Sequence, residues 1–280
     1  MTNNPLQQYF RSIKLYITLP SGTSYYKDDV ITFTDNDEVG IMAMTAKDEV
    51  YTKNPDALLN GEAIAHIISS CVPSVKQPKK LLANDIDALM IAIRHATYGD
   101  DLEVNIPCDE CKHSNTFTVN ISQSLANIEK LEEEYFLGTK DGIKIYIKPF
   151  SYQDTVKALQ AQFDQYKIAT ELADQSKSED SRMKTFSKSF KTLVELNSQL
   201  LTNCIIKIEQ TEADICVTNR EHISEYIQDV DKSTFSQLDN LVKEVNAIGV
   251  NKTFDAVCEK CGHKWEAEID FNPVNFFTES

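Results

Sequence analysis

Four of the seven cysteines form two Cys-x-x-Cys pairs, Cys108/Cys111 and Cys258/Cys261. A short run with strand-like composition precedes and follows each pair, so we expect each pair at the tip of a β-hairpin. Two such tips facing each other would place four thiolates at the corners of a tetrahedron, as in a zinc ribbon. The pattern therefore predicts one metal site built by all four cysteines. Four thiolates suit Zn(II), and Fe is the alternative metal for the same donors.

The distance between the two pairs along the chain indicates what such a site would do. The pairs are separated by 146 residues. Closing a loop of this length costs about 5 kcal/mol of chain entropy, whereas a structural zinc ion supplies roughly 10–16 kcal/mol at neutral pH. A site closed by four thiolates also has no open position for a catalytic water. The predicted role is therefore structural: one metal ion per chain ties the middle of the chain to its end.

Three other interpretations of the cysteine pairs are weaker. A thioredoxin-type redox pair would open a helix, whereas strand-like sequence follows both pairs here. His113 and His263 lie two residues after each second cysteine and would allow two separate sites, but each site would lack a fourth ligand. The pairs could also be unrelated buried thiols. Cys71, Cys204 and Cys216 lie in apolar contexts, and we expect all three in the core.

The elements that position the two pairs repeat along the chain. An offset of 150 residues aligns Cys108 with Cys258 and Gly99 with Gly249, and each glycine ends a helical pattern. Each half also opens with a predicted hairpin, at residues 13–17 with 39–44 and at residues 135–137 with 143–147. Each hairpin leads into a capping-box pattern, and these patterns are Thr45-x-x-Asp48 and Ser151-x-x-Asp154.

The sequence therefore predicts an α+β fold of two duplicated units, each a β-hairpin plus helices, joined by a zinc-ribbon-like pair of cysteine knuckle hairpins. The predicted boundaries are 1–122 for the first unit, 123–134 for a linker, 135–271 for the second unit and 272–280 for a tail. Helical periodicity predicts an insertion in the second unit at about 155–210. This insertion would be a helical hairpin packed on its own domain, and a partner-docking arm is the alternative.

Composition and charge exclude several classes of protein. The chain has 28 Lys+Arg against 43 Asp+Glu, a formal charge of −15, which disfavours binding to nucleic acid and to anionic membranes. Hydrophobic residues make up 41% of the chain, enough for a core. No apolar run approaches the roughly 18–20 residues of a membrane-spanning helix. The first residues lack a secretory signal pattern, so we expect a reducing compartment.

No catalytic constellation stands out. His66, His95 and His222 have no nucleophile at a suitable spacing, and we expect them to be surface or satisfied core residues. The eight glycines lie nearly all at turns, and none forms a phosphate-binding loop. We therefore expect a protein without enzymatic activity and without a small-molecule substrate.

A series of short segments in the first 120 residues carries a resemblance. The series comprises Leu19–Gly22, Met44–Glu49, Leu58–Gly61, Ser70–Val72, Leu81–Asp85, Ala92–Arg94, Tyr98–Gly99 and the first cysteine pair. It resembles the baseplate hub protein family of T-even-like, contractile-tailed bacteriophages. The remaining chain shares this resemblance only through its second cysteine pair.

The resemblance implies a non-enzymatic structural component of a phage tail baseplate. Its expected location is the virion tail baseplate, after assembly in the host cytoplasm, and its expected partners are other baseplate or tail proteins. The alternative is a transient tail-assembly chaperone that is absent from the mature virion. A nucleic-acid-binding zinc ribbon ranks a distant third, because the knuckle loops are net negative and have no exposed aromatic platform beyond Trp265.

Phe276 and Phe277, in the predicted tail, are candidate partner-binding residues. Two adjacent phenylalanines are costly to leave in water, at roughly 1.5–3 kcal/mol for each fully buried equivalent. They could fold back onto their own chain, or they could insert into a neighbouring tail protein as a short linear anchor.

Overall fold

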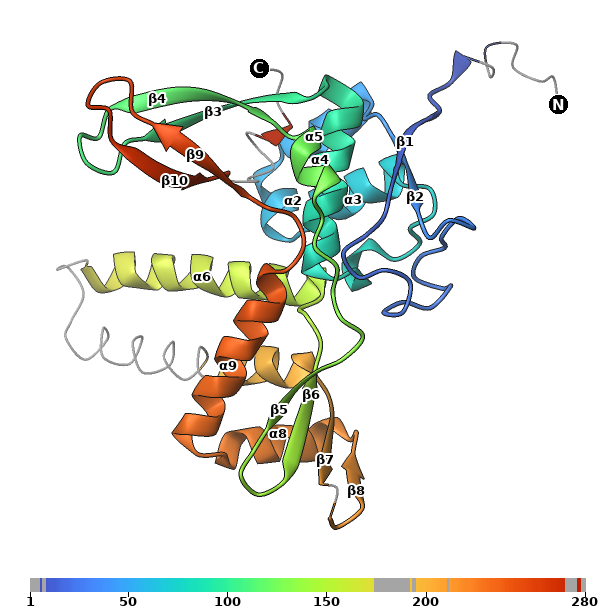
Figure 1. Cartoon of the computed structure of the whole chain (residues 1–280), viewed down its shortest axis with the longest axis vertical. Helices are drawn as coiled ribbons and strands as arrows, with labels where there is room; N and C mark the ends of the chain where they lie inside the picture. The colour runs from blue at the N-terminus through green and yellow to red at the C-terminus, as the bar shows by residue number, and fades with distance from the viewer. Residues whose placement is uncertain are drawn as a thin grey trace. The chain divides into compact units, whose positions relative to one another are not determined.

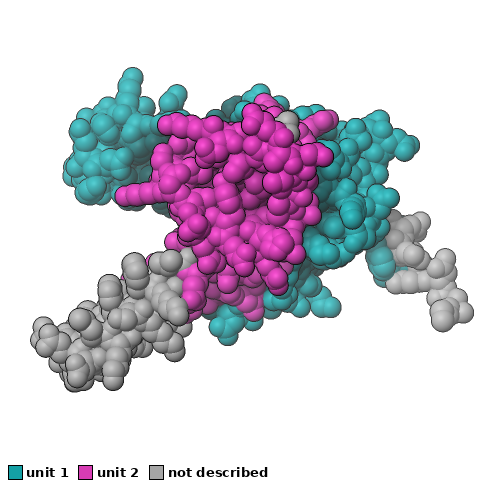
Figure 2. Space-filling model, turned by 90° about the horizontal axis from the view of Figure 1, so that it is seen from below, with its two compact units in different colours: residues 1–58, 62–131, 249–280 teal, residues 59–61, 132–248 magenta. Residues whose placement is uncertain are grey.

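The computed structural model describes residues 6, 9–173, 192, 195–210, 212–269 and 276–277. The chain divides into two compact units, which Figure 2 colours separately. Unit 1 comprises residues 1–58, 62–131 and 249–280, and unit 2 comprises residues 59–61 and 132–248. The second cysteine pair thus belongs to the same compact unit as the first. The boundaries predicted at residues 122 and 135 follow the sequence repeat rather than compactness, and they stay a prediction.

Unit 1 combines two-stranded sheets with helices (Figure 1). Its first sheet pairs β1 (Ile13–Ile17) with β2 (Val39–Met42), and four helices and one 3-10 helix follow: α1 (Ala46–Thr52), α2 (Pro55–Leu59), α3 (Glu62–Cys71), η2 (Pro78–Lys80) and α4 (Ala83–Tyr98). Its cysteine hairpins are β3 (Asp101–Pro107) with β4 (Ser114–Asn120), and β9 (Thr253–Val257) with β10 (Lys264–Glu268). The short helix α5 (Ser122–Ala126) follows β4.

Helix α4 forms the centre of the unit 1 core. Its apolar residues lie around the whole helix rather than along one stripe, which is typical of a helix covered on all sides. The buried apolar side chains of α4 are Ile86, Ala88, Leu89, Met90, Ile91, Ala92 and Ile93. Helix α3 adds Ala63, Ile64, Ile67, Ile68 and Cys71 to the same core. The polar residues of α4 that are buried with them, Asp85 and Arg94, must therefore find partners inside the protein.

Unit 2 is a four-stranded antiparallel sheet with helices on one face. The strand order is β5 (Tyr135–Gly138), β6 (Ile143–Ile147), β7 (Ile205–Gln210) and β8 (Ile215–Val217). The helices α8 (Arg220–Asp229) and α9 (Lys232–Ala247) pack on this sheet, and α6 (Tyr152–Ala173) follows β6. None of the described helices of the chain is long and apolar enough to cross a membrane.

The helical insertion is shorter than the sequence predicts. Helix α6 is present and residues 195–204 are helical, but residues 205–210 form β7 instead of continuing the helix to about 210. Ile205 and Ile208 are buried where β7 pairs with β6, so strand pairing outweighs the local helical pattern. The middle of the predicted insertion, residues 174–191 and 193–194, lies outside the described residues.

The cysteines outside the two pairs divide into two groups. Cys71 and Cys204 are fully buried, as predicted, and burial raises the pKa of the Cys71 thiol to about 12. Cys216 is exposed, so its predicted place in the core is wrong. Cys216 pairs with Glu209 of β7, and its neighbour Ile215 is exposed as well, so this end of the sheet is open to solvent, which apolar neighbours in the sequence do not reveal.

A buried carboxylate joins the loop after β1 to α4. Asp85 is fully buried, and it accepts hydrogen bonds from the Ser21 amide (3.0 Å) and from the Tyr26 hydroxyl. Burial raises the pKa of Asp85 to about 6, although both hydrogen bonds act in the opposite direction. The folded chain therefore holds a proton on this carboxyl more tightly than the unfolded chain, in which the pKa of an aspartate is about 3.9.

We predict that acidification from pH 7 to pH 5 stabilises the wild-type chain relative to the Asp85→Asn variant. The gain in free energy of unfolding should be about 1 kcal/mol, because the raised pKa of Asp85 lies between these two pH values. Urea denaturation of both proteins at pH 5 and pH 7 measures it. A wild-type protein that loses stability relative to the variant on acidification would contradict this assignment.

Candidate metal centre

The two cysteine hairpins lie side by side in unit 1 (Figure 1), and each carries its Cys-x-x-Cys pair at its tip. The first tip follows β3 at Pro107 and ends at Ser114, where β4 begins. The second follows β9 at Val257 and ends at Lys264, where β10 begins. The two hairpins have the same register, since each strand pair closes with partners seven residues apart. The prediction that both pairs occupy hairpin tips is confirmed.

The four cysteine sulfurs form one cluster. All of them lie within 4.8 Å of one another. The shortest contacts cross between the hairpins: Cys108 Sγ lies 3.7 Å from Cys261 Sγ, and Cys111 Sγ lies 3.6 Å from Cys258 Sγ. A tetrahedral ion with Zn–S bonds of about 2.3 Å requires S–S edges of about 3.8 Å. The four cysteines are thus close enough to bind one metal ion, and their spacing is consistent with zinc.

Backbone hydrogen bonds shape the two knuckles in the same way. The amides of Cys108 and Cys258 donate to the carbonyls of His113 (2.8 Å) and His263 (2.9 Å), respectively. The residue after each second cysteine has a positive φ: 57° at Lys112 and 73° at Gly262. This left-handed conformation is natural for glycine and is strained for a lysine, so the first knuckle keeps its shape at a local cost.

The thiols of the second knuckle differ in their tendency to ionise. Desolvation opposes the ionisation of Cys258, but the amides of Cys261 and Lys260 and the nearby sulfurs lower its pKa to about 6. The His263 amide favours the thiolate of Cys261, but desolvation and the sulfurs of Cys111, Cys258 and Cys108 raise its pKa to about 12. A divalent cation bound to the sulfurs would favour the thiolate form of both cysteines, because its charge stabilises all the thiolates together.

The two histidines of the knuckles are not part of the sulfur cluster found among the described residues. His263 stacks on Trp265 with ring centroids 5.8 Å apart, and its Nδ1 lies 3.6 Å from the Glu110 carboxylate of the other hairpin. The backbone carbonyl of His113 accepts hydrogen bonds from the Cys108 amide and from Asn115 Nδ2. One cluster of four sulfurs, rather than two separate sites, is therefore what the fold builds.

Asn115 supports the cluster, although it was not among the residues predicted for the site. This residue is 1% exposed and lies on β4, directly after the first knuckle. Its Oδ1 accepts a hydrogen bond from the Glu259 amide (3.0 Å), inside the second knuckle, and its Nδ2 donates to the His113 carbonyl (3.0 Å). A polar residue on a short strand carries no sequence signal of such a role, because its partner is remote in the chain.

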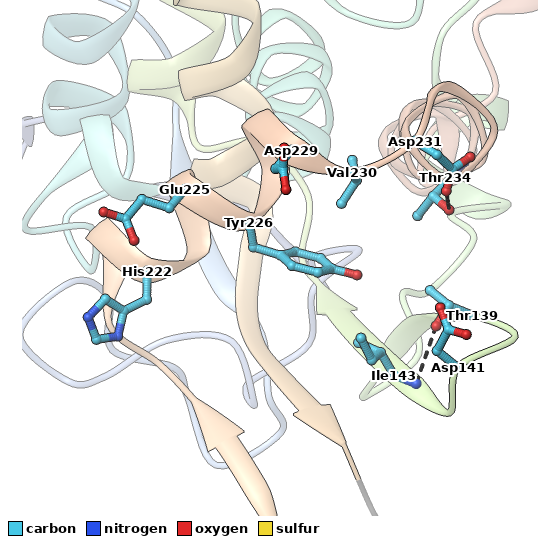
Figure 3. A pocket seen from close by; sticks show the side chains of 10 residues that line it. All are labelled: Thr139, Asp141, Ile143, His222, Glu225, Tyr226, Asp229, Val230, Asp231 and Thr234. Atoms are coloured by element: carbon cyan, nitrogen blue, oxygen red, sulfur yellow. Dashed lines mark hydrogen bonds between the residues drawn. The ribbon is translucent and has the colours of Figure 1, made fainter.

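The other conspicuous polar feature is an open cleft of unit 2 with a volume of about 490 Å³ (Figure 3). Carboxylates dominate its lining, which consists of Thr139, Asp141, Ile143, His222, Glu225, Tyr226, Asp229, Val230, Asp231 and Thr234. Two of its three hydroxyl groups are engaged locally: Thr139 Oγ1 accepts from the Ile143 amide (3.3 Å), and Thr234 Oγ1 donates to Asp231 (2.6 Å). The His222 ring points away from Tyr226 and from both threonines (Figure 3).

The remaining predicted histidines have structural partners. His66 Nε2 lies 3.3 Å from the Asp48 carboxylate, and its ring stacks on Tyr51 with centroids 3.7 Å apart. His95 Nδ1 lies 2.6 Å from Asp100. Asp48 itself closes the predicted capping box with Thr45 at the start of α1. Both imidazoles thus lie beside carboxylates of neighbouring elements rather than beside a nucleophile.

The structure places Phe276 and Phe277 in the core of their own unit, where they are 2% and 0% exposed. The guanidinium of Arg94 donates to the Phe276 carbonyl (2.9 Å), and the Tyr98 hydroxyl donates to the Phe277 carbonyl (3.0 Å). The Arg94 guanidinium also lies 5.7 Å from the centroid of the Phe276 ring. To contact a partner, the pair would first have to leave this site, so its partner-binding role stays a prediction.

We predict that Phe277→Ala lowers the free energy of unfolding by about 3–5 kcal/mol, because it removes a fully buried ring. Phe10→Ala is the matched control: its ring is 61% exposed in the same unit, and its loss should change stability by less than about 0.5 kcal/mol. Chemical denaturation of both variants gives the two values. Equal stability of the Phe277 variant and the wild type would show that the ring is not part of the core.

Comparison with known proteins identifies the family. A family model described as T4 bacteriophage base plate protein matches residues 10–278, nearly the whole chain. Comparisons with curated proteins and with solved structures gave no match. The family match confirms the resemblance to phage baseplate proteins and extends it from the first 120 residues to the second half. The chain belongs to the family of T4 bacteriophage base plate proteins.

Proposed function

We propose that this chain is a non-enzymatic structural component of a phage tail baseplate, in the hub region, that acts through contacts with other baseplate or tail proteins. The match of the baseplate family to residues 10–278 is the observation that supports this role. The proposed location is the virion tail baseplate, reached by assembly in the host cytoplasm. Nucleic acid, membranes and small-molecule substrates are not among the proposed partners.

We further propose that Cys108, Cys111, Cys258 and Cys261 hold one structural zinc ion per chain. The sulfur spacing and the four-thiolate chemistry support this assignment, and Fe is the alternative ion. Bound there, the ion would cross-link the two hairpins. All four ligand positions come from the protein, so the proposed role of the ion is mechanical rather than catalytic.

A duplication of hairpin, helices and knuckle is the proposed origin of this architecture. The two knuckle hairpins support it, since Pro107 pairs with Ser114 as Val257 pairs with Lys264, at an offset of 150 residues. Ser151 and Asp154 also exchange hydrogen bonds before α6, as the capping-box residues do before α1. Superposition of residues 12–121 on residues 135–271 in an experimental structure tests the duplication.

The alternative function is a transient baseplate or tail assembly chaperone. Quantitative mass spectrometry of purified phage particles separates the two functions. A virion component should be present at a fixed ratio to other baseplate proteins, and particles should retain it after extensive washing. Its absence from mature particles, together with its presence in assembly intermediates, would support the chaperone and overturn the structural role.

We predict one zinc ion per chain in protein purified without chelator, as measured by elemental analysis. Cys258→Ser should abolish stoichiometric zinc and cost several kcal/mol of unfolding free energy, because a site with three thiolates loses much of its affinity. Cys216→Ser is the matched control: this exposed thiol lies outside the cluster, and its loss should leave both zinc and stability unchanged. Iron in place of zinc would select the alternative ion, and absence of both would overturn the metal site.

A further inference from the structure

The Asn115 side chain connects the two knuckles through hydrogen bonds that involve no cysteine sulfur. It reaches from β4 of the first hairpin to the Glu259 amide, which lies between Cys258 and Cys261 in the second knuckle. The Nδ2 atom of the same side chain donates to the His113 carbonyl, which also accepts a hydrogen bond from the Cys108 amide. The amide group of Asn115 is buried, and its oxygen and its nitrogen both have partners in the knuckles. It therefore links the two halves of the sulfur cluster.

Aromatic rings on the strands also join the same two hairpins. The Phe117 ring, from β4, lies 5.4 Å from the Phe254 ring on β9 and 6.0 Å from the Trp265 ring on β10, both in edge-on geometry. Edge-on aromatic pairs are favourable beyond the surface that they bury. The hairpins thus share an apolar contact that does not involve any cysteine.

The segment that carries the second hairpin is also fixed at both of its ends. Before β9, the Glu129 amide donates to the Gly249 carbonyl (2.8 Å), and Lys252 Nζ lies 2.5 Å from the Asp87 carboxylate of α4. After β10, the Phe276 and Phe277 carbonyls accept hydrogen bonds from Arg94 and Tyr98 of the same helix. None of these four contacts depends on a thiolate.

We propose that the four-cysteine site is assembled before the metal binds, and that Asn115 is the positioning residue that holds the two knuckles at the required separation. This inference rests on the metal site of the proposed function. Contacts that involve no sulfur join residues 249–269 and 276–277 to the rest of unit 1, and in this proposal these contacts offset the entropy cost of closing the long loop. The metal then enters four thiols that are already in place, which favours tight binding through preorganisation.

The repeat makes the role of Asn115 specific to one hairpin. Asn115 pairs with Ile106 in the first hairpin, and the residue at the corresponding position of the second hairpin is Trp265, which pairs with Ala256. The first hairpin thus contributes the amide bridge, and the second contributes the indole ring. This division predicts that substitutions at Asn115 affect metal binding although Asn115 is not a ligand.

Trp265 is the only tryptophan of the chain, so its fluorescence reports whether the hairpins are docked. The experiment compares the full chain loaded with Zn²⁺ and the same chain stripped by a chelator under reducing conditions. We expect the emission maximum to stay within a few nanometres of the loaded value. A shift to the emission maximum of the urea-unfolded chain would show that the metal itself brings the hairpins together, and it would overturn preassembly.

The second experiment measures metal affinity by competition with a chromophoric chelator, with Zn²⁺ and with Co²⁺ as a spectroscopic probe. Asn115→Ala should weaken binding by about 10–100-fold, the usual effect of removing an outer-sphere partner. The stoichiometry and the four-thiolate Co²⁺ spectrum should stay as in the wild type. Asn105→Ala is the matched control, since Asn105 is exposed and bonds Thr116 within its own hairpin (2.6 Å).

The outcomes separate this inference from the proposed function. A wild-type chain that binds neither ion removes the metal site itself. A wild-type chain that binds one ion but opens on chelation keeps the metal site and overturns preassembly. Wild-type affinity in Asn115→Ala overturns the role of Asn115. The chelation measurement on the wild-type chain decides preassembly whether or not the Asn115 variant folds.

Discussion

Unit 1 is built from two stretches of chain that are separated by almost the whole of unit 2, since residues 132–248 lie between them. Together, the contacts between these two stretches must offset the entropy cost of closing the long loop between them. The sulfur cluster is the place where this constraint is most visible, because each of its shortest S–S contacts joins one stretch to the other. The second stretch, which begins at Gly249, can belong to unit 1 only while its contacts with the first stretch hold.

Helix α4 contacts segments from both stretches of unit 1. Three polar residues of this helix each bind a different segment: Asp85 binds the loop after β1, Asp87 binds Lys252, and Arg94 binds the Phe276 carbonyl. Burial raises the pKa of Asp87, and the ion pair with Lys252 acts against that shift. Polar groups inside an apolar core are costly unless they are paired. These pairings therefore favour one arrangement of the three segments around α4 over other arrangements of similar apolar burial.

The same features fit a protein that works by holding its shape. The sulfur cluster brings four cysteines together, His66, His95 and His263 lie beside carboxylates or rings, and Phe276 and Phe277 are buried in their own unit. The family match to phage baseplate proteins places the chain among parts of a large protein assembly.

The local features of this protein could be predicted from its sequence. The Cys-x-x-Cys spacing predicted both knuckles, the strand-like runs beside them predicted β3, β4, β9 and β10, and the Thr45/Asp48 pattern predicted the start of α1. These features depend on neighbours within a few residues. The tertiary structure alone decided that residues 205–210 form a strand, that Cys216 is exposed, and that Asn115 bridges the knuckles. Each of these depends on a strand pairing, a sheet edge or a hydrogen-bond partner far away in the chain, which local pattern and propensity do not contain.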